Sequence, residues 1–296
     1  MKDARNIFII LTVLMTLFAT AGCGNTHSTG QTQEGADKDK VITIGYIPWD
    51  EDIAVTYMWK ELLEEKGYKV KVAQADVAPL FAGVAQGNMD LFLDVWMPIT
   101  HKSYMERFGG KFKILNTWYK RADSGLAVPD YVQAKTIEDL KNHKSAFKGK
   151  IVSIEPGTGI QELTNNAIKG YGLNGWQVID SSTPAMLAEL GRAIEHKQPI
   201  IVTLWRPHWA FKKYPIRYLE DPKSYLNPKG PEHIQTISSL QFPKDHPEVA
   251  KWLRQFKMNE EDLAALEAEM NDTKDTTKAV KKWISENRQV TDEWMK

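Results

Sequence analysis

The chain has 296 residues, of which 42% are hydrophobic and 26% charged, with 38 basic residues against 38 acidic ones and one cysteine. This length and balance are typical of a globular protein with two domains of ordinary size. A net charge of zero argues against nucleic acid or an anionic membrane surface as a partner, and a single cysteine excludes a disulfide framework.

The N-terminal region has the pattern of an export signal. Two basic residues precede an apolar run over 7–19, and Thr-Ala-Gly-Cys follows, ending at Cys23. This order predicts a secretory signal, and Cys23 lies where a bacterial lipobox places its lipidated residue. We therefore expect 1–22 to be a lipoprotein signal peptide and 23–40 a flexible tether. An uncleaved membrane anchor is the alternative, and the apolar run is short for it.

The globular part is predicted to begin near Val41 and to alternate strands with helices. In its first block, strands are expected at 41–47, 68–73 and 89–95, and helices at 50–66, 77–86 and 98–108. In its second block, strands are expected at 151–154, 177–179 and 200–204, and helices at 159–169, 184–195 and 208–212. This alternation indicates βαβ units and an α/β protein with parallel sheets.

From residue 243 onward the pattern is helical, with helices expected at 243–257, 260–270, 273–286 and 291–296. Such a tail usually packs back on the first block, so we expect lobe 1 to comprise 41–125 and 232–296, and lobe 2 to comprise 126–231. The chain would then cross between the lobes twice, near 124–129 and 229–238. Two lobes joined by two strands form a hinge.

Three predicted strands run out into a tryptophan, namely Trp49, Trp96 and Trp205. Ligands of open α/β sheets bind outside the carboxyl ends of the strands, so the three indoles are expected around one crevice. Indole faces attract cations, and quaternary ammonium groups are the usual guests of aromatic cages. A single tryptophan in this position is more often a packing residue, and the other seven in the chain are assigned to packing.

The strand ending at Ile154 leads into the turn Glu155-Pro-Gly-Thr-Gly-Ile160 and a helix. A turn of this kind leaves backbone N–H groups free at a helix start, where the helix dipole also favours an anion. It is not a dinucleotide fingerprint, because the third glycine is missing. His101, five residues after Trp96, could donate to a carboxylate, although taken alone it is typical of a capping or surface residue.

Four segments together resemble the glycine betaine-binding lipoproteins of ABC osmoprotectant transporters, over about residues 41–296. They are Tyr46-Ile-Pro-Trp49-Asp-Glu-Asp-Ile-Ala, Trp96-Met-Pro-Ile-Thr-His101-Lys-Ser-Tyr, Pro156-Gly-Thr-Gly-Ile160 and Trp205-Arg-Pro-His-Trp209. Some family members carry the two halves in the opposite, circularly permuted order; here the half with Trp49 and Trp96 comes first.

The resemblance implies a two-lobed periplasmic-binding-protein-like fold of type II. It implies a prism of Trp49, Trp96 and Trp205 around a trimethylammonium group. The ligand carboxylate would be held by His101 and by the backbone amides of Gly159 and Ile160. It also implies a lipid-anchored receptor on the extracytoplasmic face of the membrane, which delivers glycine betaine, and also proline betaine, to an ABC permease with its ATPase subunit. No cofactor, metal or nucleic acid is expected.

Two alternatives stay open at this point. A carnitine or choline receptor of the same transporter class would use a similar cage. A surface-anchored enzyme is disfavoured, because the sequence has no Gly-x-Ser-x-Gly elbow and no His-Glu-x-x-His pair, and its seven histidines lack metal-ligand spacing. Arg206, next to Trp205, could touch ligand, stabilise closure or point to solvent.

Overall fold

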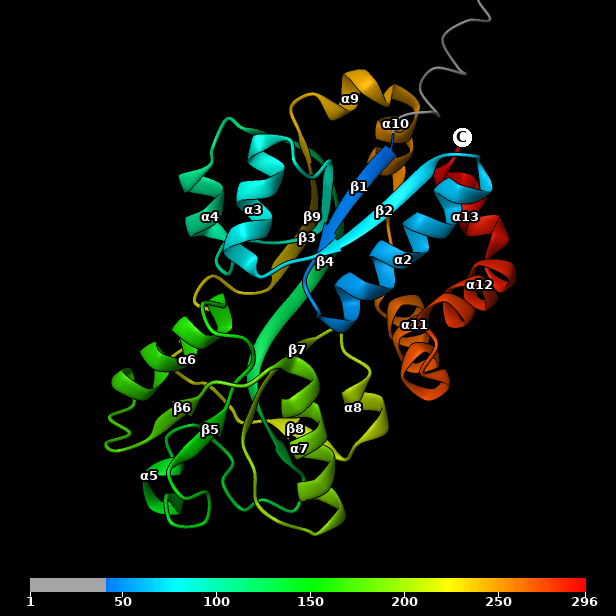
Figure 1. Cartoon of the computed structure of the whole chain (residues 1–296). Helices are drawn as coiled ribbons and strands as arrows, with labels where there is room; N and C mark the ends of the chain where they lie inside the picture. The colour runs from blue at the N-terminus through cyan, green and yellow to red at the C-terminus, as the bar shows by residue number, and fades with distance from the viewer. Residues whose placement is uncertain (1–40) are drawn as a thin grey trace, which may run out of the picture.

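One long strand links the two halves of the molecule in this computed structural model, which describes residues 41–296. The expected signal peptide 1–22, Cys23 and the tether 23–40 lie outside the described residues. Strand β4 (Phe112–Pro129) runs from the upper lobe into the lower one (Figure 1). It pairs antiparallel with β9 (Glu232–Ser239) over its first part, and with β7 (Val202–Arg206) from Asp123 onward.

The first lobe contains the predicted βαβ units. Its elements in chain order are β1 (Val41–Tyr46), α2 (Asp50–Glu65), β2 (Lys69–Gln74), α3 (Val77–Gln86), β3 (Leu91–Met97) and α4 (Lys102–Arg107). β1 lies between β2 and β3 and is parallel to both. All but the last residue of β3 are buried, as expected for a strand inside a sheet covered on both faces. Gly87 directly follows α3 as its C-cap residue, and its φ of 77° is left-handed and suits glycine.

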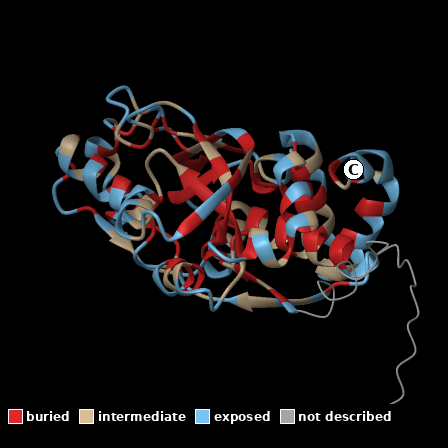
Figure 2. Ribbon diagram, turned by 90° about the horizontal axis from the view of Figure 1, so that it is seen from above, coloured by how far each residue is buried: buried red, intermediate tan, exposed pale blue. Residues whose placement is uncertain are grey.

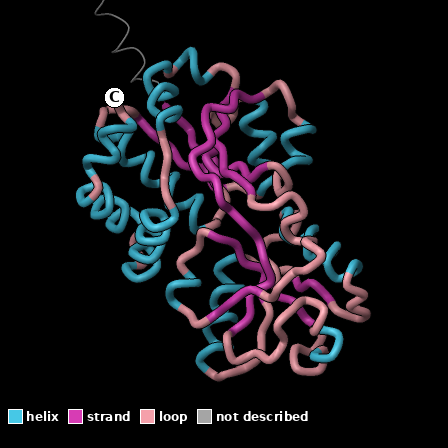
Figure 3. Tube along the Cα trace, turned by 180° about the vertical axis from the view of Figure 1, so that it is seen from behind, coloured by secondary structure: helices cyan, strands magenta, loops and turns pink. Residues whose placement is uncertain are grey.

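The second lobe repeats this arrangement on a smaller scale. Its elements are α5 (Leu140–His143), β5 (Lys150–Val152), α6 (Gly159–Gly170), β6 (Gln177–Ile179), α7 (Thr183–Glu195), β7, α8 (Ala210–Lys213) and β8 (Ile216–Tyr218). β5 is parallel to both β6 and β7, while β8 pairs antiparallel with the end of β4. Seen from behind, the strands continue from one sheet into the other through β4 (Figure 3).

The C-terminal helices pack on the first lobe. They are α9 (Phe242–Asp245), α10 (Pro247–Gln255), α11 (Glu260–Thr273), α12 (Thr276–Glu286) and α13 (Arg288–Trp294). Trp59 of α2, fully buried, lies edge-on to Phe256 and stacks on Trp294. On the surface, Arg288 makes a bidentate ion pair with Glu65 at 2.5 and 3.0 Å. The core therefore joins residues from both ends of the described chain.

Several predicted element boundaries were wrong. The two expected crossover segments do lie in strands, but these strands are parts of longer pairings than predicted: β4 begins at Phe112, and β9 lies inside the first sheet between β3 and β4. The helix expected at 98–108 is only α4, because the preceding turn is held by Glu232, which accepts from the backbone N–H groups of Ile99 and Thr100 at 2.9 Å. The helix expected at 243–257 is split at His246, whose φ of −134° is not helical.

Burial follows the pattern expected of covered sheets. Buried residues lie on the strands and on the inner sides of the helices, and exposed residues lie on the outer sides (Figure 2). No helix within residues 41–296 is long and apolar enough to cross a membrane.

Candidate functional site

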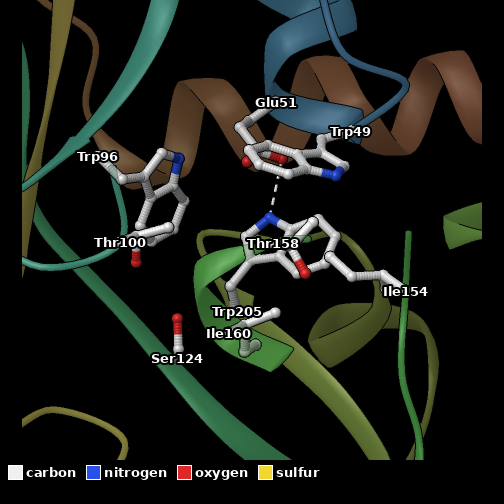
Figure 4. Close-up of a pocket in the computed structure, with 9 residues that line it drawn as sticks. All are labelled: Trp49, Glu51, Trp96, Thr100, Ser124, Ile154, Thr158, Ile160 and Trp205. Carbon is white, nitrogen blue, oxygen red and sulfur yellow. Dashed lines mark hydrogen bonds between the residues drawn. The ribbon is translucent and has the colours of Figure 1, made fainter. Parts of the chain in front are cut away.

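The three predicted tryptophans converge on one pocket between the lobes. The space between the lining residues that atoms leave empty is about 280 Å³, part of it open to solvent. Figure 4 shows the nine residues that line it. They are Trp49, Glu51, Trp96, Thr100, Ser124, Ile154, Thr158, Ile160 and Trp205.

Trp49 and Trp205 form two walls that come from different lobes. Trp49 follows β1 and precedes α2, while Trp205 lies in β7. Their ring centroids are 6.1 Å apart, with the rings tilted by 53°. Both side chains are 4% exposed, so the rings are almost completely withdrawn from solvent. A ligand between them would contact faces supplied by both lobes at once.

Trp96 supplies the third wall, from the end of β3, and is organised by His101. The backbone N–H of Trp96 donates to Nδ1 of His101 at 3.0 Å, and the backbone N–H of His101 donates to the carbonyl of Trp96 at 3.0 Å. Thr100 in the same turn donates its hydroxyl to Glu232 at 2.6 Å. This double pairing closes the turn after β3 and sets the position of the indole.

His101 stacks on Trp49 and is not among the residues that line the pocket. Its ring is fully buried and parallel to the Trp49 indole, at 5.7 Å between centroids. Burial lowers the pKa of His101 to about 3, so the ring is neutral at physiological pH. Because Nδ1 accepts a hydrogen bond, the proton is on Nε2, which is buried without a hydrogen-bond partner among the described residues. The Nε2–H of His101 is thus a buried donor next to Trp49 that could still form a hydrogen bond.

Each of the three pocket indoles donates its Nε1–H to the carboxyl group of an acidic side chain. Trp205 donates to Glu51 at 2.8 Å, the bond drawn in Figure 4. Trp96 donates to Asp94 at 3.1 Å, and Trp49 donates to Glu155 at 3.3 Å. These bonds fix the ring edges and leave the faces directed at the pocket.

The opposite part of the pocket is formed by the start of α6. Thr158 is the N-cap residue and Ile160 lies in the first turn, and both line the pocket. The first N–H groups of a helix have no partner within it, so this end can bind an anion. Gly159 allows the helix to approach the other lobe, because a Cβ there would lie 2.6 Å from the backbone oxygen of Thr100.

A group of buried carboxyl groups lies behind the Trp205 wall. Glu51, Asp52, Asp94 and Glu267 are all fully buried. Burial raises the pKa of each of them, and the nearby carboxyl of Asp94 raises that of Glu51 further. Ionisation of Glu51, which lines the pocket, is therefore disfavoured in the folded protein.

Residues after Trp205 continue the contact between lobes. Trp209 donates its indole N–H to Asp50 at 2.7 Å and its backbone N–H to Glu267 at 2.8 Å. His208 Nε2 lies 3.3 Å from Asp50. The segment that follows β7 is therefore bound to the start of α2 and to α11, which belong to the first lobe.

Arg206 does not line the pocket. Its guanidinium group makes a bidentate pair with Asp123 of β4, at 2.9 and 2.6 Å, and lies over the ring of Tyr218 at 4.7 Å. Of the three roles left open by the sequence, ligand contact has no support here, since the side chain is bound to a strand that both lobes share.

Five pocket residues were not predicted from the sequence, namely Glu51, Thr100, Ser124, Ile154 and Thr158. Glu51, Thr100 and Thr158 lie inside the segments that carried the resemblance, so their neighbours gave a signal. Nothing in the sequence shows that Ser124 of β4 would reach the same pocket. Within the described part of the chain, no group of three or more His, Cys, Asp or Glu side chains is arranged to hold a metal ion.

The fold and the pocket define a two-lobed solute-binding protein. The sequence model for the "Substrate binding domain of ABC-type glycine betaine transport system" matches residues 40–286, and the chain belongs to this family. The family consists of binding domains and not of enzymes, as expected from the sequence.

A curated relative has a sequence similar to this chain. The glycine betaine/carnitine transport binding protein GbuC of Listeria monocytogenes serotype 1/2a is 39% identical over 146 residues, which cover 49% of this chain. The match spans 48% of that relative, or about half its length.

Two solved structures share the fold. Lactococcal OpuAC, crystallised in its closed-liganded conformation with glycine betaine, has a TM-score of 0.82 and 33% identity, over 87% of this chain and 100% of that one. The glycine betaine/L-proline-binding protein ProX of Borrelia burgdorferi has a TM-score of 0.81 and 28% identity, over 86% and 96%. The predicted α/β periplasmic-binding-protein fold is confirmed.

We predict that Glu51→Gln makes stability less dependent on pH. Because the pKa of Glu51 is raised in the folded protein, the folded state keeps a proton that the unfolded state loses above about pH 4.3. The free energy of unfolding of the wild type therefore falls as pH rises toward the raised pKa. Glutamine does not titrate and still accepts from Trp205, so the stability difference should shift in favour of the variant as pH rises.

Denaturant titrations at several pH values between about 4 and 8 measure this difference. Glu106→Gln, at an exposed position on α4, is the matched control and should show no such trend. A difference between Glu51→Gln and wild type that is the same at every pH would contradict the prediction.

Proposed function

We propose that the protein is an extracytoplasmic receptor that binds glycine betaine, and also proline betaine, and delivers it to an ABC importer for osmoprotection. The observation that carries this proposal is the convergence of three indoles from two lobes on one small pocket opposite a helix N-terminus. A zwitterion with a quaternary ammonium group at one end and a carboxylate at the other matches that polarity.

The cage would hold the cation. A trimethylammonium group has no N–H to donate, so ring faces suit it better than a carboxylate that would lose its own solvation. Each indole face contributes about 0.5–2 kcal/mol. Burial of the three methyl groups adds a hydrophobic contribution of about 25 cal/mol per Å². We assign this role to Trp49, Trp96 and Trp205.

The start of α6 would hold the carboxylate, through the backbone N–H groups of Gly159 and Ile160. His101 is assigned to the same end because its Nε2–H is a buried donor without a partner among the described residues, and its ring stacks on Trp49. The helix dipole adds a favourable contribution of about 0.3–1 kcal/mol for an anion at this position.

Closure of the lobes would couple binding to transport. We propose that lobe 1 (41–125 and 232–296) carries Trp49, Trp96 and His101, and that lobe 2 (126–231) carries the start of α6 and Trp205. Ligand then gains its full set of contacts only when the lobes are shut, and this differential affinity stabilises the closed form. The closed form would dock on the permease, whose ATPase partner drives uptake, with Cys23 as the lipid anchor to the membrane.

A binding panel tests the proposal. Titration calorimetry with glycine betaine, proline betaine, carnitine and choline should give the tightest binding for glycine betaine or proline betaine. The small pocket disfavours the longer carnitine, and choline offers no anion to the start of α6. Absence of glycine betaine binding up to millimolar concentration would contradict the proposal. Choline binding more tightly than betaine would contradict the assignment of the anion end.

Replacing Trp205 should weaken binding and destabilise the closed form. Trp205→Ala removes one cation-binding face and the indole donor to Glu51. A loss of about 1.5–3 kcal/mol is expected, or roughly 10- to 100-fold in the dissociation constant. Trp176→Phe is the control, because Trp176 packs against Phe147 away from the pocket. Equal affinities of Trp205→Ala and wild type in calorimetry would remove Trp205 from the cage.

Gly159→Ala should prevent full closure without unfolding the protein. The added Cβ would lie 2.6 Å from the oxygen and 2.8 Å from the Cα of Thr100, and these backbone atoms cannot rotate away. We expect betaine affinity to fall at least about tenfold, a cost of about 1.4 kcal/mol. The melting temperature of the ligand-free protein should change little.

Gly191→Ala is the matched control for Gly159→Ala. Its Cβ would meet only the hydroxyl of the Tyr214 side chain, at 3.0 Å. Small-angle scattering with saturating betaine should show compaction for wild type and Gly191→Ala but less for Gly159→Ala. Full compaction of Gly159→Ala would show that the contact with Thr100 does not limit closure.

A further inference from the structure

We propose that Thr158 is a further ligand-binding residue that determines specificity: its hydroxyl donates a hydrogen bond to the anionic group of the bound zwitterion. The inference rests on the proposed function and extends it to a residue outside the set of two amides and a histidine. Thr158 is the N-cap residue of α6, between the turn Pro156-Gly157 and the glycine that approaches Thr100.

The hydroxyl of Thr158 is not used as a helix cap. Threonine at an N-cap normally accepts from a backbone N–H in the first turn of the helix. Thr158 has the extended backbone of an N-cap residue, with φ −81° and ψ 150°, yet its side chain makes no capping hydrogen bond. The N–H groups at the start of α6 are therefore not occupied by this side chain.

Instead, the Thr158 hydroxyl is a buried polar group at the pocket. The residue is 3% exposed, and its Oγ1 is fully buried with no hydrogen-bond partner among the described residues. The side chain is one of the nine that line the pocket (Figure 4). A buried hydroxyl without a partner costs about 1–3 kcal/mol, so a ligand that accepts from it recovers that free energy.

The surroundings favour an anion as the acceptor. Thr158 adjoins the positive end of a helix of 12 residues, which favours negative charge. Other groups nearby are already paired: the N–H of Gly157 donates to Gln161 at 3.0 Å, and the hydroxyl of Thr164 donates to the carbonyl of Ile160 at 2.7 Å. The Thr158 hydroxyl is thus left to donate beside the free N–H groups of the first turn.

Such a bond would act on zwitterions and not on simple cations. Hydrogen bonds to a charged acceptor are worth about 1.5–3 kcal/mol, more than those between neutral groups. Tetramethylammonium fills an aromatic cage but carries no acceptor. The Thr158 hydroxyl should therefore raise the affinity for glycine betaine relative to tetramethylammonium.

Three proteins and two ligands test this inference: wild type, Thr158→Val and Thr158→Ser, each titrated with glycine betaine and tetramethylammonium by calorimetry. Valine keeps the shape of threonine and removes the hydroxyl, whereas serine keeps the hydroxyl. We expect Thr158→Val to bind glycine betaine about 10- to 100-fold more weakly. Thr158→Ser should stay within about threefold of wild type, and tetramethylammonium should bind all three proteins equally. Because the hydroxyl makes no cap, the ligand-free melting temperature of Thr158→Val should match that of wild type.

Each other outcome contradicts the inference in a recognisable way. If Thr158→Val binds glycine betaine as wild type does, the hydroxyl does not contact the anion. If the affinities for both ligands fall equally in Thr158→Val, the residue shapes the pocket and its hydroxyl does not bind the anionic group. If wild type binds tetramethylammonium but not glycine betaine, the proposed function fails together with this inference, whereas failure of Thr158 alone leaves wild-type betaine binding intact.

Discussion

The hydrogen bonds from the three pocket indoles to acidic side chains are the interactions on which the site depends. An indole ring has a negative face and a positive edge, and its N–H lies on that edge. Glu155, Asp94 and Glu51 accept from these edges, so each ring is held where its face borders the pocket. Without these acceptors, the three indole rings between the two lobes could adopt other orientations. The carboxyl groups thus orient the rings without themselves having to bind a cation.

Two of these three bonds also join the lobes. Trp49 of the first lobe donates to Glu155 of the second, and Trp205 of the second donates to Glu51 of the first. The contact continues along the chain, where Trp209 donates to Asp50. Closing the lobes and orienting two of the rings are therefore one event. A ligand that stabilises the ring positions therefore also stabilises the closed arrangement. Binding of the ligand is in this way coupled to closure of the lobes.

Burial determines the charge of the pocket wall. Glu51 and Asp94 are fully buried, and the cost of charge in a dry environment raises the pKa of both. A carboxyl group whose ionisation is disfavoured still accepts from an indole N–H, and it repels the carboxylate of a zwitterion less than an ionised group would. The anion end works in the opposite way, since free N–H groups and a hydroxyl at the start of α6 supply positive potential without a formal charge.

Periodicity and strand endings in the sequence were enough to predict the α/β class, the βαβ blocks and the positions of Trp49, Trp96 and Trp205 at strand ends, because these depend on local patterns of apolar residues. Three features were not predictable: the extent of β4, the burial of Glu51 and the stacking of His101 on Trp49. They depend on contacts between residues far apart in the chain, such as the pairing of Arg206 with Asp123. The sequence by itself determined which side chains stand at the ends of the strands. Only the tertiary structure decided which of them face the pocket, because that depends on how two lobes, each folded around its own sheet, come into contact.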